Sequence, residues 1–91
     1  IIDTGGTISE AARVLKDHGA SRVFACATHG LFSGPAVERL NSAPIEEIIV
    51  TNSISQPPDL GLENLKVLSV ASLLGEAIDR IFKDLSVSVL F

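Results

Sequence analysis

Two short runs of apolar residues, neither broken by polar alternation, constrain this fold more than any other feature. One covers residues 23–28 and the other is Ile48-Ile49-Val50. Strands that are apolar on both faces are typical of parallel sheets, because helices cover both sides of such a sheet. The sequence therefore predicts an α/β fold in three layers, with a mostly parallel sheet flanked by helices.

Segments with helical periodicity are interleaved with these runs. The first is predicted over residues 7–18, where apolar side chains recur on one face. Thr7 and Glu10 match a capping box at its start, and Gly19 is a natural stop. A second helix is expected directly after Ser33-Gly34-Pro35, which offers a cap and a proline for the first turn. A third is expected over residues 72–83.

The remaining segments add strands and a loop. Residues 66–70 match a third short strand, and residues 52–64, with Pro57-Pro58 and Gly61, match a long irregular loop. In the tail, Ser86 and Ser88 alternate with valines, which predicts a half-exposed terminal strand. The alternating order of strands and helices is that of a sheet wound with right-handed crossovers.

Length and charge limit the classes of function. The 91 residues can bury one modest core, so one domain is the upper limit. The chain opens on Ile1-Ile2, which suggests an incomplete domain whose first supporting strand lies upstream. The net charge is -4 and the seven basic residues are scattered singly, which disfavours nucleic-acid binding. No apolar run approaches the ~20 residues that span a bilayer, so no membrane segment is expected.

Cys26 is the single cysteine of the chain and lies inside an apolar run. It has no partner for an internal disulfide, which fits a reducing compartment. Nothing electropositive adjoins it in sequence, so a buried, inert thiol is expected and a catalytic one is not.

The first loop carries the chemistry. In parallel sheets ligands bind at the carboxyl ends of strands, which places residues 3–7, 29–33 and 51–55 around one predicted site. Within the first, Asp3-Thr4-Gly5-Gly6-Thr7 lies between a strand end and a helix start. The glycines allow a tight turn, and amides at a helix N-terminus attract an anion. Thr4 and Thr7 offer hydroxyl donors. The loop therefore predicts a site for a phosphate monoester, and a plain helix-capping turn is the alternative.

Asp3 requires a separate role, because a carboxylate repels a phosphate dianion. We expect it to orient the loop or to accept a hydrogen bond from a sugar hydroxyl, and proton transfer is the less favoured role. His29 ends a strand among small residues, and a hydrogen bond to a neighbouring loop is favoured over catalysis. His18 is expected to be solvated at a helix C-terminus. Neither histidine is expected to be a metal ligand, because no second ligand stands at a suitable spacing.

The loop resembles the signature of the type I phosphoribosyltransferase fold, in which an acidic pair and two aliphatics precede a Thr/Gly-rich loop and a helix. Here the acidic pair would lie upstream of Ile1. Residues 27–36 (ATHGLFSGPA), 50–54 (VTNSI) and 86–91 (SVSVLF) are similar to the ribose-phosphate diphosphokinases in particular. The resemblance covers the whole chain and implies that residues 1–91 are the C-terminal phosphoribosyltransferase-like domain of such an enzyme, without its N-terminal half.

The resemblance also implies a reaction. The enzymes of this family transfer the diphosphoryl group of ATP to the 1-hydroxyl of ribose 5-phosphate, with Mg²⁺ bound mainly through the substrates and the absent half. Asp3, Thr4, Gly5, Gly6 and Thr7 would bind the sugar phosphate. Because the family's ATP site lies largely in the N-terminal half, this chain alone is expected to be inactive. A cytoplasmic homo-oligomer, a hexamer in the family, is implied, and an organellar form stays open.

The tail carries a further expectation from the same resemblance. Ser86, Val87, Ser88 and Phe91 correspond to the part of these enzymes that contributes to a regulatory phosphate or ADP site at a subunit interface. Without the resemblance, a solvent-facing serine pair on an edge strand is the ordinary interpretation.

Two other functions remain open on sequence grounds. A purine or pyrimidine phosphoribosyltransferase would use the same sugar-phosphate loop. A non-catalytic, synthetase-associated regulatory subunit would keep the fold for assembly, although its loop is expected to have lost the two glycines that stand here.

Overall fold

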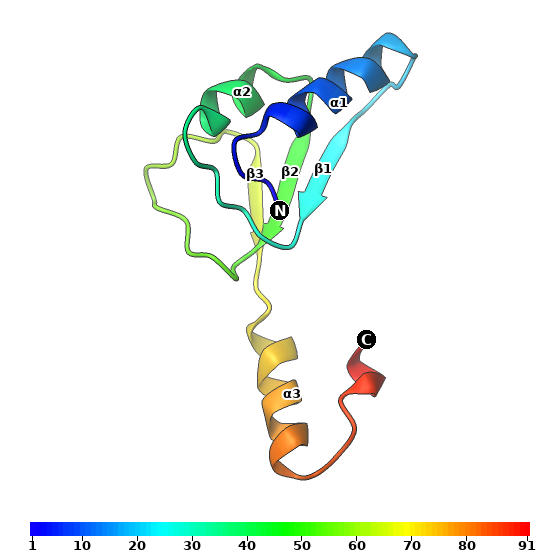
Figure 1. Cartoon of the computed structure of the whole chain (residues 1–91), viewed down its shortest axis with the longest axis vertical. Coiled ribbons are helices and arrows are strands. Elements are labelled where there is room, and N and C mark those ends of the chain that lie inside the picture. Colours follow the sequence, from blue (N-terminus) through cyan, green and yellow to red (C-terminus); the bar gives the residue numbers. More distant parts are fainter.

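A computed structural model describes all 91 residues and shows a small α/β body from which the C-terminal part projects (Figure 1). In chain order the elements are α1 (Gly6–Asp17), β1 (Phe24–Ala27), α2 (Ala36–Ser42), β2 (Glu47–Thr51), β3 (Leu65–Leu68), α3 (Ala71–Phe82) and a short 3₁₀ helix, η1 (Ser88–Leu90). Strands and helices alternate from α1 to β2, but β3 follows β2 without a helix between them, so the predicted strict alternation is not found there. No helix combines the length and the apolar character that crossing a membrane requires.

The sheet is parallel throughout, with strand order β1-β2-β3. Ala25 is paired with Ile48, and Ile48 with Leu65, across the three strands. The core lies where one face of this sheet meets α1 and α2. It consists of Ile2, Ala12, Val23, Ala25, Phe32, Ala36, Leu40, Ile45, Ile48 and Val50. The predicted parallel α/β architecture is confirmed.

The opposite face of the sheet has no helix over it in this chain. Successive strand residues point to opposite faces, so Ala25 is buried while its neighbours Phe24 and Cys26 are exposed. The expectation of a buried Cys26 is therefore wrong, because the run of apolar residues supplies both faces and only one of them is covered. The domain is incomplete, and its third layer is not formed by these residues.

The start of α1 also differs from the expectation. The helix begins at Gly6, its N-cap is Gly5 in the left-handed region at φ 77°, and no side chain caps it. Thr7 lies inside the first turn, so the predicted capping box with Glu10 is not formed. The glycine instead turns the chain into the helix through a left-handed conformation that threonine rarely adopts.

The tail is not a strand. Ser86 and Ser88 share a hydrogen bond of 2.7 Å between their hydroxyls, and the Ser88 amide donates to the Ser86 hydroxyl at 3.2 Å. Serine side chains that bond locally compete with extended structure, and here they lead into η1. The predicted terminal strand is wrong, because alternation alone does not supply a neighbouring strand to pair with.

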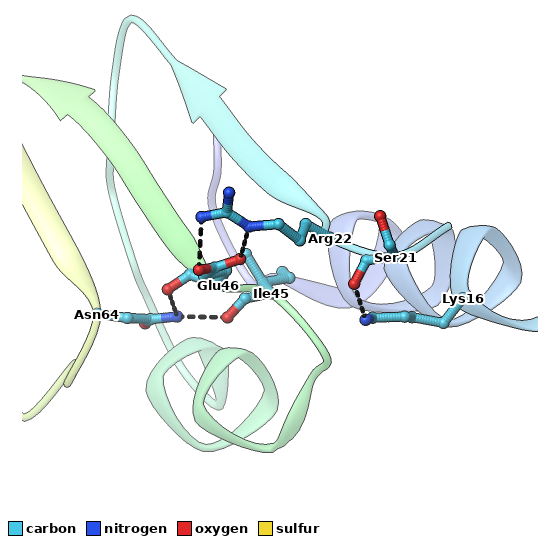
Figure 2. A network of polar contacts seen from close by, with 6 residues as sticks. All are labelled: Lys16, Ser21, Arg22, Ile45, Glu46 and Asn64. Atoms are coloured by element: carbon cyan, nitrogen blue, oxygen red, sulfur yellow. Dashed lines mark hydrogen bonds and ion pairs between the residues drawn. The ribbon is translucent and has the colours of Figure 1, made fainter. Parts of the chain in front are cut away.

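A polar cluster joins the amino ends of β1 and β2 (Figure 2). Arg22 donates two hydrogen bonds to the carboxylate of Glu46, at 2.6 and 2.8 Å. The Asn64 amide donates to the carbonyl of Ile45 at 2.7 Å, which brings the start of β3 alongside. The bond from Arg22 lowers the pKa of the Glu46 carboxyl below its ordinary value of 4.5. This cluster fixes the end of the sheet opposite the predicted site.

Candidate functional site

The structure brings the first two predicted loops together at the carboxyl end of β1. The Ile2 amide donates to the His29 carbonyl at 3.0 Å, and the Leu31 amide donates to the Ile2 carbonyl at 2.9 Å. This pattern makes Ile2 and Gly30 a parallel bridge. One step further, the Ser33 amide donates to the Asp3 carbonyl at 3.1 Å. The start of the chain thus runs alongside residues 29–33.

The third loop joins them through side chains. His29 Nδ1 lies 2.7 Å from the Ser53 hydroxyl, and the Gln56 amide donates to the Gly30 carbonyl at 2.7 Å. The prediction that His29 contacts a neighbouring loop is confirmed. His18 caps the C-terminal end of α1 and is exposed, as expected. The three strand ends therefore form one rim, as parallel-sheet topology requires.

Backbone amides of the first loop are left unpaired at this rim. None of the N–H groups of residues 4–8 donates to a carbonyl or a side chain, and the first bond of α1 runs from the Ser9 amide to the Gly5 carbonyl. The first turn of any helix leaves such donors unpaired. Here the turn at Gly5 extends the series backwards to Thr4. These donors, with the positive end of the helix dipole, can bind an anion.

The back of this loop rests on α2, and that contact explains Gly5. A Cβ added at Gly5 would lie 3.1 Å from Leu40 Cγ and 3.5 Å from the Ala36 carbonyl oxygen. Both of those residues are completely buried. A Cβ at Gly5 would therefore require the buried Leu40 side chain to move by a few tenths of an ångström, in addition to the strain of a positive φ.

Asp3 is held by Ser33. The Ser33 hydroxyl donates to Asp3 Oδ1, and the Ser33 amide binds the Asp3 carbonyl, so one residue holds both ends of the aspartate. This arrangement fits the loop-orienting role and directs the carboxylate toward residues 29–33. Ser33 was expected as a helix cap and, within residues 29–33, at the same rim as Asp3, but the bonds between the two residues were not predicted.

Arg39 is the residue at this site that the sequence did not indicate. It lies on α2 and is exposed, and its Nη1 donates to the Thr4 carbonyl at 3.3 Å. The same atom would lie 3.2 Å from a Cβ added at Gly6. All the ion pairs of the chain involve other residues, so Arg39 has no acidic partner. Only the fold, which places α2 behind the loop, reveals this contact.

The space beside the loop is small. A cavity of about 170 Å³ is lined by Ile1, Ile2, Asp3, Gly5, Thr7 and Ile8. No three His, Cys, Asp or Glu side chains gather in a way that could hold a metal ion. The side chains present therefore form no metal site of their own, and the donors that this loop offers to an anion are its backbone amides.

The residues of the predicted regulatory site lie apart from this loop, on the projecting C-terminal part (Figure 1). The Ser86 carbonyl accepts a hydrogen bond of 3.0 Å from Arg80 of α3. Phe91 is 82% exposed. The structure thus adds a cation to the two serine hydroxyls, and it brings none of these residues near Asp3 to Thr7.

Comparisons with known proteins point to one family. A family model described as the phosphoribosyl synthetase-associated domain matches residues 1–91. Curated relatives include ribose-phosphate pyrophosphokinases from Caldanaerobacter subterraneus, 52% identical, and Gloeobacter violaceus, 56% identical; both matches cover the whole chain and 29% and 27% of the relatives. A crystal structure of phosphoribosylpyrophosphate synthetase from Mycobacterium smegmatis matches with a TM-score of 0.87 and 43% identity, over 91% of this chain and 28% of that one. The chain thus spans less than a third of these relatives.

Proposed function

This chain belongs to the phosphoribosyl synthetase-associated domain family, and on that premise we propose that it is the ribose 5-phosphate-binding part of a ribose-phosphate diphosphokinase. The proposed enzyme transfers the diphosphoryl group of ATP to the 1-hydroxyl of ribose 5-phosphate, giving phosphoribosyl diphosphate and AMP. Relatives that match the whole chain bear this enzyme's name. In this proposal the chain is the C-terminal part of a cytoplasmic, oligomeric protein.

The observation that carries the proposal is the series of unpaired amides over residues 4–8. A phosphate monoester presents several acceptor oxygens, and charge-assisted bonds from backbone N–H groups are among the stronger hydrogen bonds. The hydroxyls of Thr4 and Thr7 stand beside these amides. Asp3 keeps its position through Ser33, which limits its repulsion of the anion.

The remaining chemistry needs cations that this chain does not gather. Diphosphoryl transfer depends on positioning and on stabilising the moving negative charge. Because the side chains here form no metal site, Mg²⁺ would be held by the substrates and by other parts of the protein. We therefore expect no turnover from residues 1–91 alone.

The test removes one amide and leaves the fold in place. Thr7→Pro in the full-length protein deletes the N–H of the second helical residue, which makes no bond in the helix, and proline is tolerated in a first turn. The preceding Gly6 has no Cβ to clash with the proline ring. Thr7→Ala is the matched control, because it removes the hydroxyl and keeps the amide.

We expect Thr7→Pro to bind ribose 5-phosphate roughly tenfold or more weakly than Thr7→Ala, because a hydrogen bond to a charged group is lost. ATP affinity should be equal in the two variants. Titration calorimetry with each ligand provides both values. Equal affinity of the two variants for ribose 5-phosphate would show that the amide does not bind the phosphate.

The rival phosphoribosyltransferase function is separated by substrate. The full-length protein should consume ribose 5-phosphate only when ATP is present. Release of diphosphate from phosphoribosyl diphosphate on addition of a purine or pyrimidine base, without ATP, would reverse the assignment. Absence of both activities, with ribose 5-phosphate still bound, would favour a non-catalytic associated subunit.

A further inference from the structure

We propose that Arg39 positions the sugar-phosphate loop by orienting the peptide between Thr4 and Gly5, so that the Gly5 amide faces the anion. This inference rests on the proposed function and adds a residue from α2 to the site. It starts from the bond of 3.3 Å between Arg39 Nη1 and the Thr4 carbonyl.

The geometry of one peptide group links that bond to the ligand. In a planar trans peptide the C=O and the following N–H point in opposite directions. Because the Thr4 carbonyl points toward Arg39, the Gly5 N–H points away from it. That amide has no acceptor in the protein. The guanidinium also withdraws electron density through the carbonyl, which strengthens the amide as a donor.

The contacts of Gly5 place α2 on the same side of the loop. Its absent Cβ faces Leu40 and the Ala36 carbonyl, both on the helix that carries Arg39. The loop therefore has its back to α2 and its amides on the other side. Ala36 and Leu40 are fully buried, so the arginine extends from a fixed part of the core. Such support from a rigid element is what holds a binding loop in its productive geometry.

The charge of Arg39 is also free to act. No carboxylate pairs with it, although Arg22 and Arg80 each have an acidic partner. An unpaired cation behind the loop raises the potential where the phosphate would bind. The proposal gives Arg39 a positioning role and an electrostatic one, without direct contact with the substrate.

Three variants of the full-length protein test this role. Arg39→Met removes the donor and the charge and keeps much of the side-chain length. Arg39→Lys keeps the charge and one point donor. Arg13→Met is the matched control, because Arg13 is exposed on α1 and makes no side-chain bond in the structure.

We expect Arg39→Met to raise the KM for ribose 5-phosphate about tenfold, with the KM for ATP and the melting temperature unchanged. Arg39→Lys should recover part of that loss, and Arg13→Met should match the unsubstituted protein. A purely structural residue would lower the melting temperature and affect both substrates together, and that result would overturn the proposal.

Comparison of Arg39→Met with Thr7→Pro distinguishes failure of the Arg39 role from failure of the proposed phosphate site. Weak ribose 5-phosphate binding in Thr7→Pro with unchanged kinetics in Arg39→Met would refute the role of Arg39 and leave the proposed function standing. Unchanged binding in both would show that these loop amides do not hold the phosphate, and the observation that carries the proposed function would then fail as well.

Discussion

Single residues at the site show which contacts the sequence predicts and which it does not. The pattern of Asp3 to Thr7 indicates a turn with free amides, and the structure has such a turn. Ser33 and Arg39 hold that turn in place; Ser33 was expected at the same rim but without its bond to Asp3, and Arg39 was not expected at the site. Each contacts the loop from 30 or more positions away in the chain, and no local pattern encodes a contact of that span. Propensity and periodicity report neighbours in sequence, so partners brought in by topology escape them.

The Arg22–Glu46 pair gives a prediction at the same scale. The depressed pKa of the Glu46 carboxyl means that the folded state binds its proton less readily than the unfolded state. The pair therefore stabilises the fold above about pH 4.5, and this contribution is lost as the pH falls through the lowered pKa. Both side chains are largely exposed, so solvent screens the effect.

The substitution Glu46→Gln in the full-length protein should lower the melting temperature slightly at neutral pH. The difference from the unsubstituted protein should shrink as the pH falls below about 4.5 and through the lowered pKa of the native carboxylate. Glu63→Gln is the control, because Glu63 is exposed and forms no ion pair. A difference that stays constant with pH would exclude the ion pair as its cause.

At the scale of elements, sequence periodicity predicted the three helices and the three parallel strands. Their ends shifted where caps decide them, as at α1, which begins on a left-handed glycine instead of a threonine cap. The prediction of a strand in the tail was wrong. Alternation of serine and valine is compatible with a strand, but a strand needs a partner, and the serines bonded to each other instead.

The C-terminal elements support a regulatory role, which we propose for Ser86, Val87, Ser88 and Phe91. Arg80 and the two serine hydroxyls gather beside one another, so a phosphate or ADP could meet a cation and hydroxyl donors together. The helix that carries Arg80 has no buried residue, which leaves this part of the chain free for contact with another subunit.

Replacing both serines by alanine in the full-length protein should weaken regulation by phosphate or ADP roughly tenfold, measured as the half-effect concentration, with basal turnover unchanged. Ser72→Ala is the control, since Ser72 is exposed on α3 and makes no side-chain hydrogen bond. Equal loss of turnover and of regulation would mean that the serines support folding or assembly.

At the scale of the whole molecule, the chain is more extended than a complete domain. Its radius of gyration is 16.2 Å, whereas a compact chain of this length would have about 12 Å. A groove of about 320 Å³ between α1 and β1 is lined wholly by apolar residues, including Leu15 and Phe24. Exposed apolar surface of this kind is expected to be covered by the rest of the polypeptide or by another subunit.

The first residues of the chain lie beside the carboxyl end of β1. Ile2 is bridged to Gly30 in parallel, so the start of the chain already runs beside the end of β1. The expected strand and acidic pair before Ile1 stay a prediction. The sequence predicted a sheet with helices on both faces. It could not show which residues are exposed where this chain has no helix over one face. Cys26 is the example, since it lies on the face of the sheet that no helix of this chain covers.

A crystal structure of the full-length protein with bound ribose 5-phosphate would show whether the amides of residues 4–8 hold the phosphate. We predict phosphate oxygens about 2.7–3.2 Å from several amides of residues 4–8, with Arg39 on the opposite side of the loop at the Thr4 carbonyl. A phosphate bound elsewhere, with those amides left to solvent, would contradict the account.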